Sequence, residues 1–246
     1  MKCLLTGASG NLGKELQKVG EEFGIEYFPM AGRVECNISD THSIVEYCCK
    51  HANELRDIQK IIHCAAYTNV AGAEINKKQA IETNIIGTKN IISEMCDCSA
   101  SITYISTDYV YEGKAGNYKE TDITCPVNFY SFTKLAGEAY IGTKDLIIRT
   151  SFKPSVWQYQ KAFSDIYTSA DYIDIIARKI SFLIKNDAFG VYNVGTKRKS
   201  IFELAKRRNE NVQPMSKNEI KNVILPSDIS MNVEKFESFF KKHNGE

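Results

Sequence analysis

Residues 2–13 read KCLLTGASGNLG, and this stretch decides the fold class. Lys2–Thr6 is a short apolar run typical of a buried strand, and helical spacing of apolar residues begins at Leu12. Between them stands a Gly-x-x-Gly-x-x-Gly turn. Such a turn lets the backbone approach a pyrophosphate closely, and the N-terminus of the following helix adds free N–H groups. We predict a dinucleotide phosphate site here, with a merely structural turn as the alternative.

Further along the chain, apolar runs of strand length alternate with helical patterns. Strands are expected at residues 2–6, 26–30, 60–64, 102–106, 146–149 and 191–194. Helices are expected at residues 12–23, from an N-cap at Ser39 to about 51, and at 76–95, 172–184 and 201–208. This alternation predicts an α/β protein with a doubly wound parallel sheet of the Rossmann type. In such a sheet, ligands bind beyond the carboxyl ends of the strands.

The length of 246 residues fits one large α/β domain, or one domain with a small appendage. Hydrophobic residues make up 43%, enough for a substantial core. We expect an NAD(P)-binding Rossmann domain with the catalytic residues over 1–151. The less regular residues 152–246 are expected to form a small, mainly substrate-binding C-terminal region that completes the fold, without a fully independent second domain.

The overall charge is nearly balanced, with 31 basic and 30 acidic residues. It gives no electrostatic reason to expect nucleic acid or a membrane surface, and no apolar run reaches transmembrane length. Eight cysteines without a secretory signal favour a cytoplasmic, reduced protein. Cys96-Asp97-Cys98 lacks the two-residue spacer of a zinc knuckle, so we expect incidental thiols and no metal site.

Two segments carry candidate proton-transfer chemistry. Tyr130 and Lys134 stand four residues apart and share one face of a predicted helix, where the ammonium would stabilise a phenolate. Ser106 and Thr107 end a predicted strand, where a hydroxyl can reach a substrate carbonyl. The alternatives are a solvated helical pair and a turn capped by Thr107 and Asp108. The glycine turn in the same chain favours the functional interpretation.

The residues at the end of the second strand indicate whether the cofactor carries a 2′-phosphate, as in NADP, or a free 2′-hydroxyl, as in NAD. A carboxylate there would bind the ribose hydroxyls of NAD. This chain continues instead as Pro29-Met30-Ala31-Gly32-Arg33. Arg33 could meet the 2′-phosphate of NADP, so NADP(H) is favoured and NAD(H) stays as the alternative.

Taken together, these motifs resemble the extended short-chain dehydrogenases, and more closely the dTDP-4-dehydrorhamnose reductase family. The resemblance covers roughly residues 1–151. It rests on TGASGNLG at 6–13, AAYTNV at 65–70 with Ala73-Glu74, STDYVY at 106–111, and Tyr130 to Lys134 followed by LAGE.

The resemblance implies a role for each matching residue. The pyrophosphate would be held by Gly7, Ser9, Gly10, Asn11, Leu12 and Gly13. The adenine would be flanked by Asn37 and Ile38, and the path to the nicotinamide would be lined by Ala65, Ala66, Tyr67 and Ser106. Thr107, Tyr130 and Lys134 would form the catalytic triad, with Tyr130 and Lys134 also contacting the cofactor. The substrate would meet Thr107, Asp108, Phe152 and Trp157.

Two departures from the family pattern bear on the substrate. Ala71-Gly72 stands where these reductases usually carry Asp-Lys, and Phe152 stands where they have tryptophan. Trp157, the one tryptophan, either replaces that surface or belongs to the core. Dehydratases of the superfamily place an Asp-Glu pair after the threonine. Here Tyr109 follows Asp108, so the glutamate is missing and a dehydratase is not favoured.

The expected activity is NAD(P)H-dependent reduction of the 4-keto group of a nucleotide-linked 4-keto-6-deoxy sugar. Two alternatives stay open. One is a sugar-nucleotide epimerase of the same superfamily, and the other is a non-catalytic regulatory subunit that keeps the nucleotide pocket. Relatives often pair helices into dimers, so a homodimer also stays open.

Overall fold

The computed structural model describes residues 1–95, 100–219 and 226–245. In this part of the chain a six-stranded sheet has the order β10-β5-β4-β3-β1-β2. Its strands are β1 (Lys2–Thr6), β2 (Glu26–Met30), β3 (Lys60–His63), β4 (Ser101–Thr107), β5 (Leu146–Thr150) and β10 (Gly190–Val194). Each begins and ends within one residue of its expected place. The doubly wound α/β fold is thereby confirmed.

Strand β1 lies at the point where the strand order reverses. It pairs in parallel with β2 on one side and β3 on the other, so that Thr6 lies opposite both Met30 and His63. Strand β3 continues in parallel to β4. The residues that follow β1, β2, β3 and β4 therefore lie along one edge, where open α/β sheets bind ligands.

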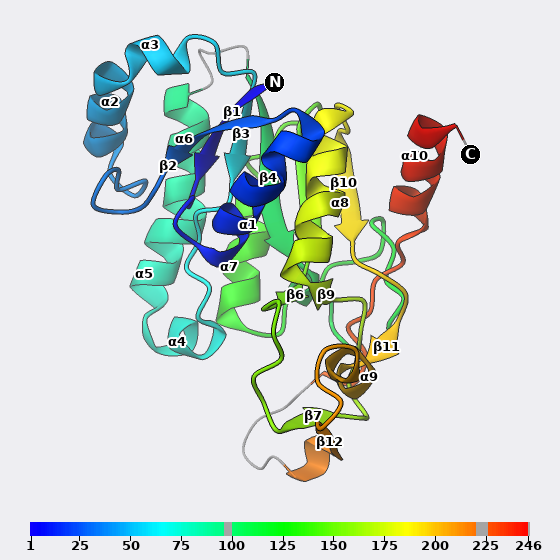
Figure 1. The fold of residues 1–246 in the computed structure, drawn as a ribbon. Coiled ribbons are helices and arrows are strands. Elements are labelled where there is room, and N and C mark those ends of the chain that lie inside the picture. The colour runs from blue at the N-terminus through cyan, green and yellow to red at the C-terminus, as the bar shows by residue number, and fades with distance from the viewer. Residues whose placement is uncertain (96–99, 220–225, 246) are drawn as a thin grey trace. The chain divides into compact units, whose positions relative to one another are not determined.

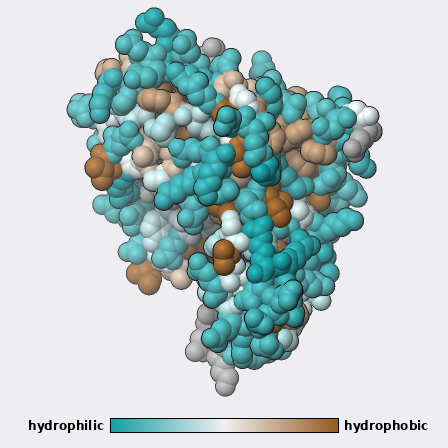
Figure 2. Space-filling model, in the orientation of Figure 1, coloured by the Kyte–Doolittle hydropathy of each residue, from teal (hydrophilic) through white to brown (hydrophobic). Residues whose placement is uncertain are grey.

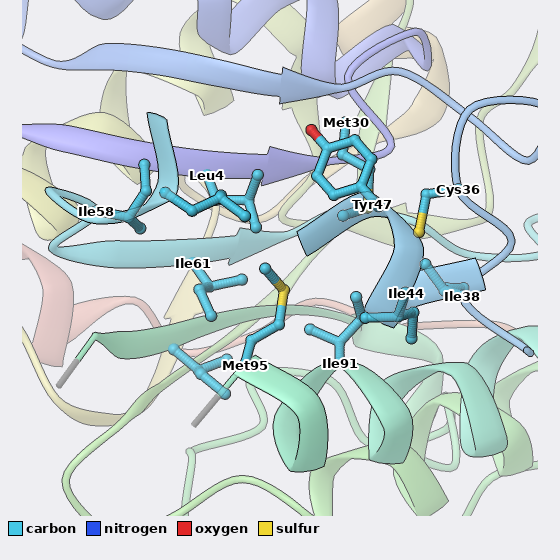
Figure 3. Close-up of a cluster of buried hydrophobic side chains, with 12 residues drawn as sticks. Leu4, Met30, Cys36, Ile38, Ile44, Tyr47, Ile58, Ile61, Ile91 and Met95 are labelled. Carbon is cyan, nitrogen blue, oxygen red and sulfur yellow. The ribbon is translucent and has the colours of Figure 1, made fainter. Parts of the chain in front are cut away.

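One face of this sheet is covered by α2 (Thr41–Lys50) and α6 (Gly87–Met95). Figure 3 shows the cluster that they form with the strands, in which Leu4 and Ile61 meet Ile44 and Ile91. Side chains alternate along a strand, so Leu5, which is fully buried, faces the opposite side. Helix α1 (Asn11–Gly20) crosses in front of the strands in Figure 1.

Two helix predictions need correction. The N-cap of α2 is Asp40, whose Oδ1 accepts from the His42 nitrogen at 3.0 Å, whereas the Ser39 hydroxyl lies buried without a hydrogen bond in the described residues. The single helix expected at 76–95 is divided into α5 (Lys77–Ile81), a π-helical turn η2 (Glu82–Ile86) and α6. A π turn re-aims side chains within a helix and is frequent at functional sites.

The remaining helices of the sheet region are short apart from α8. They are η1 (Glu21–Phe23), α3 (Ala52–Leu55), α4 (Val70–Ile75), α7 (Phe129–Glu138) and α8 (Ile173–Lys185). Helix α7 begins at Phe129 because Asn128 and Ser131 form a capping box: the Asn128 Oδ1 accepts from the Ser131 nitrogen at 2.8 Å. This cap fixes Tyr130 in the first turn.

The chain forms two compact units. The first consists of Met1–Ser106, Asn128–Ile148 and Ala177–Val191, and the second of Thr107–Val127, Arg149–Ile176 and Tyr192–Glu246. Because the chain passes between them repeatedly, they do not coincide with the expected division at residue 151.

The second unit is built from short elements. Its three two-stranded pairs are β6 (Phe152–Lys153) with β9 (Asp171–Tyr172), β7 (Lys161–Phe163) with β12 (Gln213–Met215), and β8 (Tyr167–Thr168) with β11 (Lys199–Ser200). Its helices are η3 (Asp108–Val110), α9 (Ile201–Lys206), η4 (Lys217–Glu219) and α10 (Glu234–Asn244). A small core gathers Trp157, Ala162, Ala205 and Val212.

The surface of the molecule is mainly polar on the face drawn in Figure 2, where hydrophobic side chains are scattered. None of the described helices has the length and apolar character that crossing a bilayer requires.

Candidate active site

The glycine turn after β1 requires glycine at two of its positions. Gly7 has φ of +67°, and a Cβ there would lie 2.7 Å from the Ala65 nitrogen. A Cβ on Gly13 would lie 2.5 Å from the Gly7 oxygen. Gly10 caps α1 without a side chain, so no cap side chain competes for the N–H groups of the first helical turn. Ser9, Gly10 and Asn11 are exposed, whereas Leu12 and Gly13 are buried. The turn therefore fits a pyrophosphate.

A buried histidine, which the sequence reasoning did not single out, supports this turn. The Ala65 N–H donates to Thr6 Oγ1 at 3.2 Å, which leaves the Thr6 hydroxyl proton for His63 Nδ1 at 2.8 Å. On the other side, Thr88 Oγ1 donates to the Asn84 carbonyl at 2.8 Å and accepts from His63 Nε2 at 3.1 Å. These bonds require a neutral His63 with its proton on Nε2. Burial, and then the Lys134 charge, lower the His63 pKa to about 3.

Asn84 on the π turn connects this region to the catalytic helix. Its Oδ1 accepts from the Tyr67 nitrogen at 2.7 Å, and its Nδ2 donates to the Tyr67 carbonyl at 3.1 Å and to Thr133 Oγ1 at 2.9 Å. Thr133 in turn donates to the Tyr130 carbonyl at 2.7 Å. Asn84 is fully buried, and a π turn in place of the expected continuous helix aims it. Sequence periodicity gives no signal for such a turn.

Lys134 lies buried on α7, with its Nζ 4.0 Å from the centroid of the Tyr104 ring. The Tyr104 hydroxyl donates to the Lys134 carbonyl at 3.1 Å. Burial lowers the Lys134 pKa to about 7, although the negative charge of Glu138 acts in the opposite direction. Tyr130, one helical turn earlier, is half-buried. The helix thus carries the phenol of Tyr130 together with an amine that gains or loses its proton near pH 7.

Ser106 ends the first unit's part of β4 and donates to Glu138 Oε1 at 2.5 Å. Glu138 is the last residue of α7 and is buried. This charge-assisted hydrogen bond ties the end of β4 to the last turn of α7, where sequence reasoning had noted Glu138 only as part of a motif.

In the second unit, Thr107 begins the turn η3. Its Oγ1 accepts from the Tyr109 nitrogen at 3.3 Å and lies 3.3 Å from Asp108 Oδ1. Both Thr107 and Asp108 are buried. Phe152 is half-buried in β6. Trp157 lies in the small core of this unit, so the structure favours the core alternative for its indole.

Both a cationic and an acidic side chain follow β2, and either could bind the ribose of a cofactor. Arg33 is exposed and donates to Thr83 Oγ1 at 3.4 Å. Glu35 folds back so that its Oε2 accepts from the Ala31 nitrogen at 2.6 Å. This carboxylate lies two residues beyond Arg33 and was not expected from the sequence.

The other expected cofactor contacts lie in the first unit. Ile38 is buried in the cluster of Figure 3, and the Asn37 nitrogen is held by the Ser43 hydroxyl at 3.0 Å. Ala65, Ala66 and Tyr67 are half-buried after β3. A Cβ on Gly72 would lie 2.6 Å from the Tyr67 hydroxyl, so this departure from the family's Asp-Lys pair makes room for that phenol.

Within the described residues, no group of three or more His, Cys, Asp or Glu side chains is arranged to hold a metal ion. Cys96 and Cys98, for which no zinc site was expected, lie outside the described residues.

Comparison with known proteins gives matches of three kinds. A family model described as the RmlD substrate binding domain matches residues 1–168. The dTDP-4-dehydrorhamnose reductase of Aggregatibacter actinomycetemcomitans is 29% identical over 185 residues, which cover 73% of this chain and 61% of that protein. Methionine adenosyltransferase 2 subunit beta of Xenopus laevis is 31% identical over 145 residues, which cover 56% of this chain and 41% of that protein. The chain spans less than two-thirds of the length of either relative.

Solved structures match over nearly the whole chain. The structure of dTDP-4-dehydrorhamnose reductase from Bacillus anthracis in complex with NADP superimposes with a TM-score of 0.82 at 28% identity. The match covers 99% of this chain and 92% of that one.

Proposed function

The chain belongs to the family of the RmlD substrate binding domain, and from this premise we propose that it is an NAD(P)H-dependent sugar-nucleotide reductase. The substrate is a nucleotide-linked 4-keto-6-deoxy sugar, whose C4 ketone is reduced to an alcohol. The observation that carries the proposal is the pairing, on α7, of Tyr130 with a buried Lys134 whose pKa is lowered to about 7.

The residues of the glycine turn fit a dinucleotide, because the steric limits at Gly7 and Gly13 leave its backbone open to a pyrophosphate. Arg33 favours NADP(H), in keeping with the NADP bound to the Bacillus anthracis relative. Glu35 keeps NAD(H) as the alternative, since a carboxylate after the second strand binds ribose hydroxyls.

A bound reduced nicotinamide supplies the hydride. Tyr130 gives its phenolic proton to the carbonyl oxygen as negative charge develops there. Lys134, when protonated, stabilises the resulting phenolate and holds the cofactor's ribose. Thr107 donates a hydrogen bond to the same carbonyl oxygen. Asn84 and Glu138 keep α7 in place through Thr133 and Ser106.

The second unit, which contains most of residues 152–246, forms the substrate-binding region in this proposal. Phe152 offers an aromatic surface but lacks the indole N–H of the family's tryptophan, so contacts that need this donor are absent.

We further propose that the protein acts in the cytoplasm and that it forms a homodimer with a second copy of the chain.

The test is a cofactor-oxidation screen with the purified chain. NADPH and NADH are each supplied with dTDP-, UDP- and GDP-linked 4-keto-6-deoxy sugars, and absorbance of the reduced cofactor is followed. We expect stoichiometric oxidation with one nucleotide carrier. An epimerase would convert the sugar with no net cofactor oxidation, and that result would replace the proposal.

Replacing the phenol separates chemistry from binding. In Tyr130→Phe we expect kcat to fall by about 10²–10⁴-fold, because the general acid is lost, while NADPH affinity changes by no more than about threefold. Tyr140→Phe, just beyond α7 and 41% exposed, is the matched control and should keep full activity. Wild-type rates in Tyr130→Phe would exclude Tyr130 as the acid.

A regulatory subunit is the second candidate, and the match to methionine adenosyltransferase 2 subunit beta favours it. It predicts NADPH binding, measured by calorimetry, with no oxidation by any sugar nucleotide. Retention of Thr107, Tyr130 and Lys134 together favours catalysis, since a binding module does not need a phenol beside an ammonium.

A further inference from the structure

Asp108 holds a carboxyl group in surroundings that oppose its charge. Its side chain is 1% exposed, in the turn η3 directly after Thr107. Oδ1 lies 3.3 Å from Thr107 Oγ1, and Oδ2 is buried without a hydrogen bond in the described residues. An ionised carboxylate needs partners on both oxygens, whereas a neutral acid with its proton on Oδ1 needs fewer.

The groups that face this carboxyl come from the end of β4, from β6 and from the residue before β6. The positive charge of Lys153 and the hydroxyls of Thr107 and Ser151 favour the ionised form. Burial outweighs them and raises the Asp108 pKa to about 7. The neighbouring Tyr109 stays neutral, since burial raises its pKa to about 12.

The ionised form of Asp108 ties up the Thr107 hydroxyl. A carboxylate is only an acceptor, so in the 3.3 Å contact between Thr107 Oγ1 and Asp108 Oδ1 the threonine must be the donor and uses its one proton. Thr107 also accepts from the Tyr109 nitrogen. In this state Thr107 has no proton left to donate to a ligand.

The protonated form reverses that bond. A proton on Asp108 Oδ1 is donated to Thr107 Oγ1, which then accepts from both Oδ1 and the Tyr109 nitrogen. With both acceptor positions of its oxygen filled, the Thr107 hydroxyl can only donate outward.

We propose that Asp108 is a positioning residue, whose protonated carboxyl turns the Thr107 hydroxyl proton toward the carbonyl oxygen of the substrate. This rests on the proposed reductase function, in which Thr107 donates to that oxygen. Asp108 gives up no proton in the reaction, because Tyr130 supplies the proton that the alcohol keeps. The residue therefore sets the direction of a hydrogen bond and is not the substrate contact that the sequence suggested.

The pair can be tested without substrate. Infrared difference spectra of the full chain with ¹³C-labelled aspartate report the protonated C=O stretch, and Asp108→Asn identifies the band. We expect this band to disappear as pH rises through about 7, and to persist to higher pH in Thr107→Val, because the carboxylate loses a donor. A carboxyl that is already ionised at pH 5, or one that Thr107→Val does not shift, would overturn the proposal.

The second arm measures kcat/KM for the reduced cofactor and a keto-sugar nucleotide against pH. Both Asp108 and Lys134 must be protonated, so the wild-type rate should fall by up to about a hundredfold per pH unit well above pH 7. In Asp108→Asn the amide Nδ2 donates to Thr107 permanently. We expect a rate within about threefold of the wild type at pH 6 and a fall of only about tenfold per unit above pH 7.

Asp108→Leu, which cannot donate to Thr107, should be slower than Asp108→Asn by about tenfold or more at every pH. An unchanged two-proton fall in Asp108→Asn would overturn the proposal while leaving the reductase assignment intact. Absence of any reduction by the wild-type chain would overturn the reductase assignment itself and with it the role of Asp108 in reduction, whereas the infrared arm would still decide the hydrogen-bond reversal.

Discussion

Lys134 is held in a site that disfavours its charge, and this has a measurable effect on stability. Burial lowers its pKa in the folded chain from 10.5 to about 7. Between these values the unfolded chain binds the proton and the folded chain does not, so Lys134 contributes stability that is complete above pH 10.5 and is lost as pH falls through 7.

We therefore expect the wild type to gain, relative to Lys134→Met, up to about 1.4 kcal/mol of unfolding free energy per pH unit above 7. Urea unfolding at pH 6, 7, 8 and 9 measures the difference. At pH 6 the methionine variant should be the more stable protein although it is inactive. Lys60→Met is the control, because Lys60 is also buried but its ammonium pairs with Asp187 at 2.9 Å. Lys60→Met should be less stable than the wild type at pH 6. If it were more stable than the wild type at pH 6, as we expect for Lys134→Met, the argument from burial would be contradicted.

At the scale of elements, the π turn η2 directs the buried side chain of Asn84 so that it hydrogen-bonds both to Tyr67 after β3 and to Thr133 on α7. Asn84→Ala would leave the Tyr67 N–H and carbonyl without their partner, and each unpaired buried group costs about 1–3 kcal/mol. We expect a loss of about 2–5 kcal/mol in urea unfolding, together with a lower kcat because α7 loses its contact at Thr133. Asn90→Ala on α6 removes a single bond to the Ile38 carbonyl and should cost about 1 kcal/mol with unchanged kcat. Equal effects of the two substitutions would mean that Asn84 has no special role.

The same elements show how far sequence reasoning reaches. Strands were predictable because each is a short apolar run bounded by turn residues, and β2 was placed residue for residue. The glycine turn and the Tyr130–Lys134 pair were predictable because their spacing is local. The π turn was not, since periodicity cannot distinguish one extra residue per turn from a continuous helix. Burial keeps His63 neutral and favours the protonated form of Asp108, and burial depends on residues distant in the sequence. The position of Glu35 depends on a turn that composition does not predict.

At the scale of the whole molecule, cofactor binding should be visible as stability of the folded chain. A ligand at a hundred times its dissociation constant adds about 2.7 kcal/mol, which raises Tm by roughly 5–10 °C for a protein of this size. NADPH should produce this shift in differential scanning fluorimetry.

Two glycine variants separate binding from stability. Gly10→Ala keeps an ordinary φ of −73°, but its methyl group lies 3.2 Å from the Gly7 oxygen on the phosphate-facing turn and alanine is a poorer N-cap than glycine. Its own stability should therefore fall by about 1 kcal/mol, as in the control below, while the NADPH shift is lost. Gly24→Ala forces alanine into a φ of +62° in open space, where the Lys185 Nζ at 3.8 Å is the nearest atom. That variant should lose about 1 kcal/mol and keep the full shift. If Gly10→Ala still shows the wild-type shift, the dinucleotide does not lie on the glycine turn, and the cofactor assignment falls independently of any measurement of activity.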